Sequence, residues 1–310
     1  YALQSGGRFD NPQTIHGGAD TGYGDSQLAA AGSSEFAVAT WVRLNADPGK
    51  EADEMMSGND QMAMLASTEV MASVWNGESW ETTALTDNGN APDLAPAVAV
   101  YGNQAIVAWR AVSATNEANP TRFDAGDSIL YKTYANGDWS DTKTLYNGTS
   151  GAVKGLEAAM MSDGTAGLVY SIDTNDRPLV GTQAQAQVLS GQAADDNTGM
   201  EIVYAVVDDL SKGQTRNGSG ETAAAANVRL TYDQQLDENP QITVTTIDGQ
   251  EHFILGWSRT TLETSSDNNT TSAHDLALRA VNSSGKLRSD LPDSVALMTS
   301  GDGVKITSKF

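Results

Sequence analysis

Hydrophobic and polar residues alternate along short stretches of this chain, and the stretches are separated by turns containing Gly, Asn or Asp. Alternation with a period of two residues predicts half-buried β-strands, and the repeated units show no helical period. In each of five places, a strand of small residues is followed by a tight turn and a second strand that ends on an aromatic residue. These segments are 26–41, 96–109, 156–170, 240–257 and 294–310.

A second predicted hairpin follows in each unit and is clearest at 71–85 and 130–145. There, Asn-Gly supplies the positive φ angles of a two-residue turn. Residues 1–15 match the same hairpin, with Phe9 in the place of Trp80 and Trp139. The spacing from this aromatic to the next strand-end aromatic is 32, 29 and 31 residues in turn. The two later hairpins, 201–210 with 225–233 and 274–291, are more degenerate.

Units of four antiparallel strands, here called a, b, c and d, are typical of β-propeller blades. The fold class is therefore all-β. We expect five blades, because strands c and d at the N-terminus and strands a and b at the C-terminus would together complete one. A part of a larger propeller or open array is the alternative. The predicted blades are 26–85, 96–145, 156–232 and 240–291, with 1–15 and 294–310 forming the split blade, in which 304–310 pairs with 1–5.

Composition narrows the possible functions. A net charge of −22 without a basic patch argues against nucleic acid or an anionic membrane as partners. The chain has no cysteine and three histidines, which excludes thiol chemistry and Cys-ligated metal sites. It contains no apolar run that predicts direct membrane insertion. It begins at Tyr1 without a signal peptide, so we expect a processed piece flanked by further domains or chains.

The strand pattern resembles bacterial secreted propeller repeats of the sialidase-like and tachylectin-like kind. In those repeats strand a begins near proline, strand b ends in an aromatic residue, and a Gly-containing turn precedes a tryptophan in strand d. Here the c–d turns read Asn76-Gly77-Glu78-Ser79-Trp80 and, at 136–139, Asn-Gly-Asp-Trp. Neither is the S-x-D-x-G-x-x-W box of sialidases, so the resemblance extends to the fold and not to that box.

The b–c connections are the longest, at 45–61, 113–127, 174–198 and 260–273, and strand alternation places them all on one face. We predict that this face binds a protein or glycan partner. The acidic loops are first interpreted as a plain solvated surface. The alternative is Ca²⁺, whose binding to the clustered loop carboxylates would order the loops. The candidate calcium ligands are Asp173, Asn175 and Asp176, and separately Asp195, Asp196, Asn197 and Glu201.

A carboxylate stands near the start of each predicted a-strand, close to the expected central channel: Asp25, Asp93, Glu157, Glu238 and Asp293. The chain is similar in this respect to five-bladed glycosidases, which place a base, an acid and a helper carboxylate there. That resemblance implies Asp25, Asp93 and Glu157 as catalytic candidates. The alternative is that strand starts are simply polar in so acidic a chain.

Arg43, Arg110 and Arg259 follow the strand-end aromatics by one or two residues and could clamp an anionic ligand, or pair with nearby acidic residues. Trp80 and Trp139 could stack on sugar rings or pack between blades. The strand-end aromatics are expected in the core.

Two functional hypotheses remain open. The first is an extracellular or cell-surface propeller that binds a partner or glycan without chemistry. The alternative is a glycoside hydrolase that uses the channel carboxylates. Fold alone does not choose between them.

Overall fold

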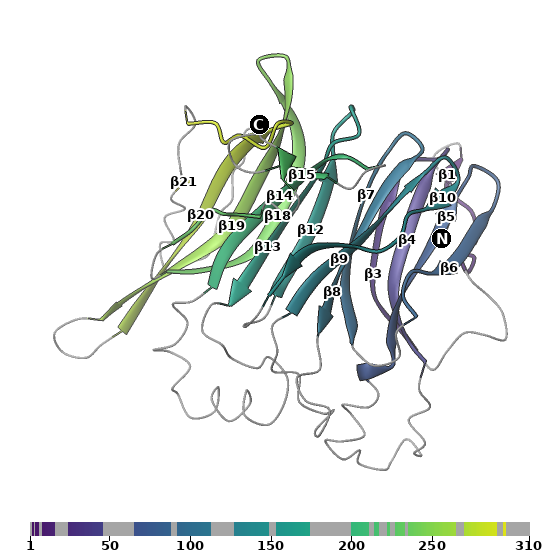
Figure 1. Ribbon diagram of the computed structural model, residues 1–310, viewed down its shortest axis with the longest axis horizontal. Coiled ribbons are helices and arrows are strands. Elements are labelled where there is room, and N and C mark those ends of the chain that lie inside the picture. Colours follow the sequence, from purple (N-terminus) through teal and green to yellow (C-terminus); the bar gives the residue numbers. More distant parts are fainter. Residues whose placement is uncertain are drawn as a thin grey trace, which may run out of the picture.

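The computed structural model describes residues 2, 4–5, 8–15, 24–45, 65–87, 92–112, 127–148, 153–173, 200–210, 214–216, 222–223, 227–232, 235–264, 270–289 and 294–295. In this part of the chain the strands form four antiparallel sheets and one two-stranded hairpin. The sheets stand side by side like the leaves of a fan, with short hairpin turns along the upper edge of Figure 1. The predicted all-β propeller architecture is therefore confirmed.

Each sheet is a blade, and the blades follow one another in chain order. Blade 1 contains β3 (Gly24–Gly32), β4 (Ala37–Leu44), β5 (Thr68–Trp75) and β6 (Trp80–Ala84). Blade 2 contains β7 (Asp93–Tyr101), β8 (Gln104–Val112), β9 (Asp127–Ala135), β10 (Asp138–Trp139) and β11 (Lys143–Asn147).

Blades 3 and 4 repeat the order with additions. Blade 3 contains β12 (Val153–Met160), β13 (Ala166–Asp173), β14 (Met200–Asp209), β15 (Gln214–Arg216), β16 (Thr222–Ala223) and β17 (Val228–Arg229). Blade 4 contains β18 (Leu236–Ile247), β19 (Gln250–Thr264), β20 (Thr270–Asn282) and β21 (Ser294–Val295). In the N-terminal hairpin, β1 (Gln4–Ser5) pairs with β2 (Arg8–Phe9), as predicted for 1–15.

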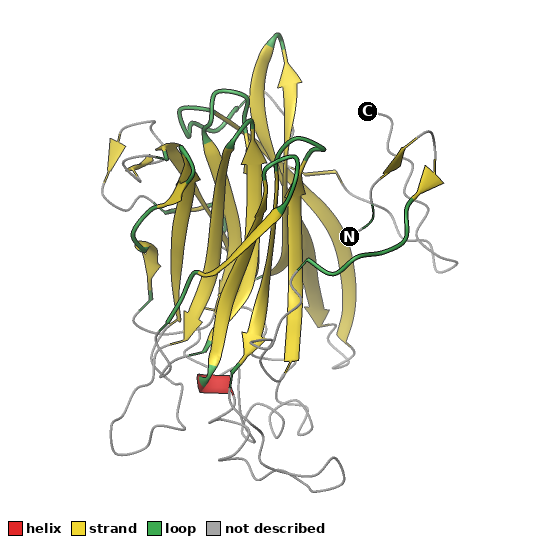
Figure 2. Cartoon of the chain, turned by 90° about the vertical axis from the view of Figure 1, so that its right-hand side faces the viewer, coloured by secondary structure: helices red, strands yellow, loops and turns green. Residues whose placement is uncertain are grey.

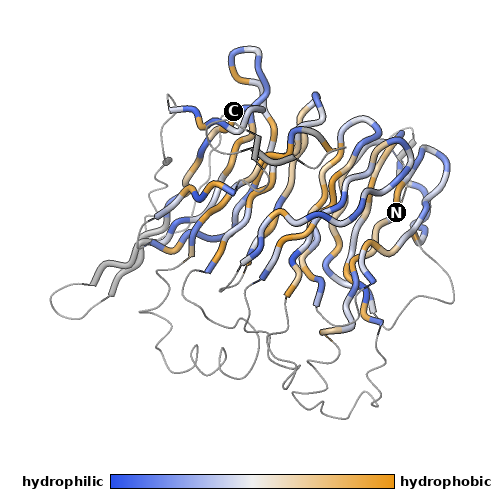
Figure 3. Tube along the Cα trace, viewed as in Figure 1, coloured by the Kyte–Doolittle hydropathy of each residue, from blue (hydrophilic) through white to orange (hydrophobic). Residues whose placement is uncertain are grey.

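The core lies between neighbouring blades, because alternate residues of one strand face opposite sides of its sheet. In β8, Val107 and Trp109 pack toward blade 1, whereas Ile106 and Ala108 pack toward blade 3. Figure 2 looks along the row of blades, so that the sheets lie one behind another, and Figure 3 shows hydrophobic stretches along the strands. The predicted core role of the strand-end aromatics is confirmed for the four described: Trp41, Trp109, Tyr170 and Trp257 are at most 6% exposed.

Two predicted turns differ from each other in the structure. Asn136 and Gly137 both have positive φ, as a two-residue hairpin turn requires. The turn at Asn76 is longer, because Trp75 pairs with Trp80 and leaves four residues between them. There the Asn76 side-chain oxygen accepts the backbone N–H groups of Glu78 and Ser79, at 2.9 Å each, and so replaces part of the backbone turn.

Two features of blade 4 correct the sequence-based boundaries. The predicted loop at 260–273 is largely an extension of the ladder, in which Thr264 pairs with Thr270. In addition, Ser294 and Val295 pair with Ala277 and Leu276 as the fourth strand of blade 4, rather than opening the split blade. The reason for this second difference is that β20 offers an edge there, which a returning segment can pair. Residues 304–310 lie outside the described part, so the predicted split blade stays a prediction. Among the described residues no helix has the length and apolar character needed to cross a membrane.

Candidate functional site

All four inner strands carry the same irregularity at the same place. In β3, β7, β12 and β18 a β-bulge sets two residues opposite the strand-end aromatic of the neighbouring b-strand. The first bulged residue always has positive φ, between 49° and 56°. These residues are Gln27, Ala95, Gly155 and Asn239. The bulge turns the beginning of each inner strand relative to its blade and so fixes the side chains that precede it.

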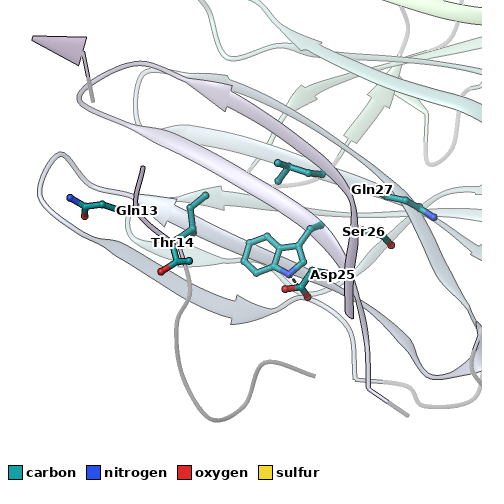
Figure 4. Close-up of a pocket in the computed structure, with 8 residues that line it drawn as sticks. Gln13, Thr14, Asp25, Ser26 and Gln27 are labelled. Carbon is teal, nitrogen blue, oxygen red and sulfur yellow. Dashed lines mark hydrogen bonds between the residues drawn. The ribbon is translucent and has the colours of Figure 1, made fainter. Parts of the chain in front are cut away.

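In three blades the residue two positions before the bulge is an aspartate that accepts the indole N–H of the opposed tryptophan. The distances from indole nitrogen to carboxylate oxygen are 3.1 Å for Trp41 to Asp25, 3.0 Å for Trp109 to Asp93 and 2.8 Å for Trp257 to Asp237. Figure 4 shows the bond to Asp25. An indole N–H is a donor only, so burial of a tryptophan requires such an acceptor.

The predicted ligand-binding arginines form ion pairs with carboxylates of their own blades. Arg43 Nε lies 3.3 Å from Asp25, and Arg259 Nε lies 2.9 Å from Asp237. Both arginines stand directly across the ladder from their aspartate.

Arg110 falls one residue earlier relative to its tryptophan and therefore faces the other side of the sheet. Its Nε contacts Asp127 at 2.6 Å. This geometry matches the ion-pairing alternative, and an anion-clamping role for the three arginines stays a prediction.

The predicted catalytic carboxylates have three different environments. Asp93 is fully buried under Trp109, whereas the Asp25 side chain is 47% exposed. Glu157 is half-buried and directly follows the two bulged residues, where Gln241 of blade 4 donates to it at 3.5 Å. Burial raises the pKa of the Glu157 carboxyl, and the Gln241 hydrogen bond partly opposes that rise. The geometry therefore favours a structural role for Asp93, and a catalytic role for Asp25, Asp93 or Glu157 stays a prediction.

Sequence reasoning missed two acidic residues, Asp237, which acts within blade 4, and Asp127, which connects blades 2 and 3. Asp237, adjacent to the candidate Glu238, is the true counterpart of Asp25 and Asp93. Asp127 accepts both Arg110 and the backbone N–H of Val153 in blade 3, the latter at 2.7 Å, and burial raises the pKa of its carboxyl while the Arg110 cation opposes that rise. Asp237 had a signal in the sequence, because an acid precedes its bonded tryptophan by 16, 16 and 20 residues in the three blades.

Of the predicted calcium ligands, the structure describes only Asp173 and Glu201. Asn175, Asp176, Asp195, Asp196 and Asn197 lie outside the described residues. Asp173 pairs with Met200 and Glu201 with Ile172, so the Asp173 and Glu201 side chains point to opposite faces of blade 3.

Glu201 is 2% exposed and binds Arg229, with 2.5 Å between the charged atoms. Within the described residues, no group of three or more Asp, Glu or His side chains is arranged to hold a metal ion. The calcium site stays a prediction.

The two turn tryptophans pack against aromatic neighbours in their own hairpins. The Trp80 ring lies 5.6 Å from Trp75, and the Trp139 ring lies 5.1 Å from Tyr134 in an edge arrangement. Both are half-buried. Trp139 also packs against the hydrophobic cluster between blades 1 and 2, as the packing alternative predicted, whereas the ring contact of Trp80 lies within its own blade. Sugar stacking by these two rings stays a prediction.

Two hollows open where elements meet near the edges of the blades. One, of about 420 Å³, lies where the N-terminal segment crosses the outer face of blade 1, and its lining includes Gln13, Ile15, Asp25 and Trp41 (Figure 4). The other, of about 550 Å³, lies among the hairpin turns of blades 1 and 2.

No protein-family model and no curated protein sequence matches this chain. Among solved structures, the hemagglutinin-neuraminidase ectodomain of parainfluenza virus 5 is 7% identical, with a TM-score of 0.44 over 86% of this chain and 58% of that chain. Trypanosoma rangeli sialidase is 10% identical, with a TM-score of 0.37 and coverages of 88% and 53%. Cellvibrio cellulosa α-L-arabinanase is 9% identical, with a TM-score of 0.38 and coverages of 84% and 76%. The likeness is one of fold.

Proposed function

We propose that this protein is an extracellular propeller module that binds glycans and performs no chemistry on them. The observation that carries the proposal is how the charged strand-end groups are used. In three of the four described blades an aspartate accepts the indole N–H of a buried tryptophan. Arginines also pair with carboxylates of their own blades, at Arg43, Arg110 and Arg259. An arrangement that repeats from blade to blade is expected to stabilise the fold. A catalytic centre, in contrast, brings several different groups together at one place.

Within the part of the chain that the structure describes, the hollow among the turns of blades 1 and 2 carries polar side chains outside these strand-end pairs. Its lining is rich in side-chain amides and contains two tyrosines. Amides provide both donors and acceptors, and aromatic rings provide flat apolar surface, which together suit a ligand that carries hydroxyl groups on an apolar ring.

A glycan array probed with the fluorescently labelled protein tests the proposal, and the result expected is selective capture of a subset of neutral glycans. A parallel assay with 4-nitrophenyl glycosides of the same sugars should release no 4-nitrophenol above the buffer blank. Capture of nothing on the array, or steady release of 4-nitrophenol, would each overturn the proposal.

Glycoside hydrolysis is a second candidate, favoured by the position of Glu157, which lies half-buried beside the Gln241 amide in surroundings that raise the pKa of its carboxyl. A general acid must hold its proton near the working pH, and a half-buried carboxyl does so better than an exposed one. If hydrolysis occurs, the substitution Glu157→Gln should abolish it and Glu251→Gln, in an exposed turn contact with Ser162, should leave it unchanged.

A further inference from the structure

The larger hollow is built from four hairpin turns of two neighbouring blades. The a–b and c–d turns of blade 1 contribute Glu35 and Asn76. The corresponding turns of blade 2 contribute Tyr101, Gln104 and Asn136. These turns emerge on the upper edge in Figure 1, opposite the ends of β4 and β8 from which the predicted b–c connections leave. A volume of about 550 Å³ lies within the range of small-ligand sites.

The amides of this hollow have hydrogen-bonding capacity that the described part of the chain does not use. The side chains of Asn103, Gln104 and Asn136 make no hydrogen bond to any described residue. Asn76 uses its carbonyl oxygen for the turn and keeps its amide N–H groups. The result is several side-chain donors and acceptors among the residues that line one space, as recognition of a hydroxyl-rich ligand requires.

Two tyrosines give the hollow an aromatic side. Tyr101 is 48% exposed, so part of its ring is accessible to a ligand in the hollow. Tyr134 is held between Phe36, with ring centres 5.8 Å apart, and Trp139, with ring centres 5.1 Å apart. The Asn136-Gly137 turn that follows has the fixed geometry of a tight hairpin. The wall is therefore formed before any ligand arrives.

The charge around the hollow is negative. Its lining includes Glu35 and contains no lysine or arginine. The pKa of Tyr134 is raised by burial and further by the negative charges of Glu81 and Asp138, which reports the sign of the local field. An anionic ligand would meet repulsion here without a cation to bind it.

The geometry points to a binding site for a neutral sugar in this hollow, between the turns of blades 1 and 2, that discriminates against sialic acid and other acidic sugars. Tyr101 provides the face on which the ring stacks, and Gln104 and Asn103 bind its hydroxyl groups. This inference rests on the proposed function and adds to it the place of the site and the charge of the ligand.

Saturation-transfer NMR and titration with a defined panel test the inference. The panel contains the methyl glycosides of glucose, galactose, mannose and N-acetylglucosamine, with N-acetylneuraminic acid as the anionic member. We expect at least one neutral glycoside to bind in the millimolar range, and N-acetylneuraminic acid to bind at least about tenfold more weakly. Tyr101→Ala should weaken the neutral glycoside about fivefold and Gln104→Ala about threefold, the loss of one modest contact in each case.

Matched controls carry the same chemistry outside the hollow. Tyr232→Ala removes a tyrosine that is 73% exposed in blade 3, and Gln250→Ala removes an exposed glutamine in a blade 4 turn. Both should bind within about twofold of the parent. If the parent binds but Tyr101→Ala and Gln104→Ala do not differ from it, the site is wrong and the proposed function stands. Preferred binding of N-acetylneuraminic acid overturns the charge argument, and no binding by the parent overturns both proposals.

Discussion

Blade 3 differs from the other three described blades at the point where strand a meets strand b. Blades 1, 2 and 4 place tryptophan opposite the bulge and aspartate two residues before it, whereas blade 3 has Tyr170 and Val153. The Tyr170 hydroxyl points away from its own inner strand and donates to Asn227 at 2.8 Å, which in turn donates to the Leu145 carbonyl of blade 2. Blade 3 therefore differs from the other blades both in its strand-end aromatic residue and in the group that accepts the hydrogen bond of that residue.

This difference indicates that each of the three aspartates serves to accept the indole N–H of its tryptophan. Where the buried ring carries no indole N–H, the inner strand carries no acid at that position, and Val153 is buried instead. The bulge and its positive φ persist in blade 3, so they depend on the blade and not on the carboxylate. A buried charge without a partner is costly, which explains why the acid is absent when its donor is absent.

The largest expected effect comes from breaking the indole pair in blade 2. Trp109→Phe should lower the free energy of unfolding by about 3–5 kcal/mol, because it removes ring contacts and leaves the Asp93 carboxylate buried without its donor. Tyr170→Phe removes one neutral hydroxyl and should cost about 1 kcal/mol. Urea unfolding followed by circular dichroism measures both. Equal costs for the two would mean that the carboxylate does not depend on the indole.

Converting blade 2 to the arrangement of blade 3 sharpens the same comparison. Adding Asp93→Val to Trp109→Phe should recover about 2 kcal/mol, because a buried carboxylate that has lost its indole hydrogen bond is replaced by an apolar side chain. Asp93→Val alone should destabilise, since it leaves the Trp109 indole without an acceptor. A double-mutant cycle gives the coupling between the two positions, and a coupling near zero would show that the pair is incidental.

The blades themselves were predictable from the sequence, because alternation and Asn-Gly turns depend on local chemistry. The bulges were not, since Gln27, Ala95 and Asn239 adopt positive φ without glycine and share no residue type. The carboxylate roles follow from those bulges: a shift of one residue in register decides whether Asp25 meets Trp41. The hollow between blades 1 and 2 was missed for a similar reason, because its lining comes from four separate turns that only the packing of two blades brings together.

Substitutions at the first bulged residue test whether the described blades share one backbone geometry there. Gly155→Ala should destabilise by about 1–2 kcal/mol, because residue 155 has φ of +56° and an added Cβ would lie 2.7 Å from Pro240 Cδ. Ala95→Gly at the matching position of blade 2, with φ of +49°, should instead stabilise by up to about 1 kcal/mol. Opposite signs in thermal melts would support one shared backbone geometry. Destabilisation by both would show that the Ala95 methyl contributes packing that outweighs its strain.

The smallest expected effect concerns Glu157, the carboxylate that follows the bulge in strand β12 of blade 3. Burial raises the pKa of Glu157 above its ordinary value of 4.5, so the folded chain holds this proton to higher pH than the unfolded chain does. The resulting stabilisation is complete below the unfolded pKa and is lost as pH rises through the folded pKa. The unfolding free energy of Glu157→Gln relative to the parent should therefore increase between about pH 4 and pH 8. Gln241→Ala removes the hydrogen bond that lowers this pKa, so the decline should move to higher pH. If the difference in unfolding free energy between Glu157→Gln and the parent does not change with pH, the Glu157 carboxyl has the same pKa in the folded and unfolded chain. Burial would then not affect the ionisation of this carboxyl, and the contrast between Glu157 and the tryptophan-bonded aspartates of blades 1, 2 and 4 would fail.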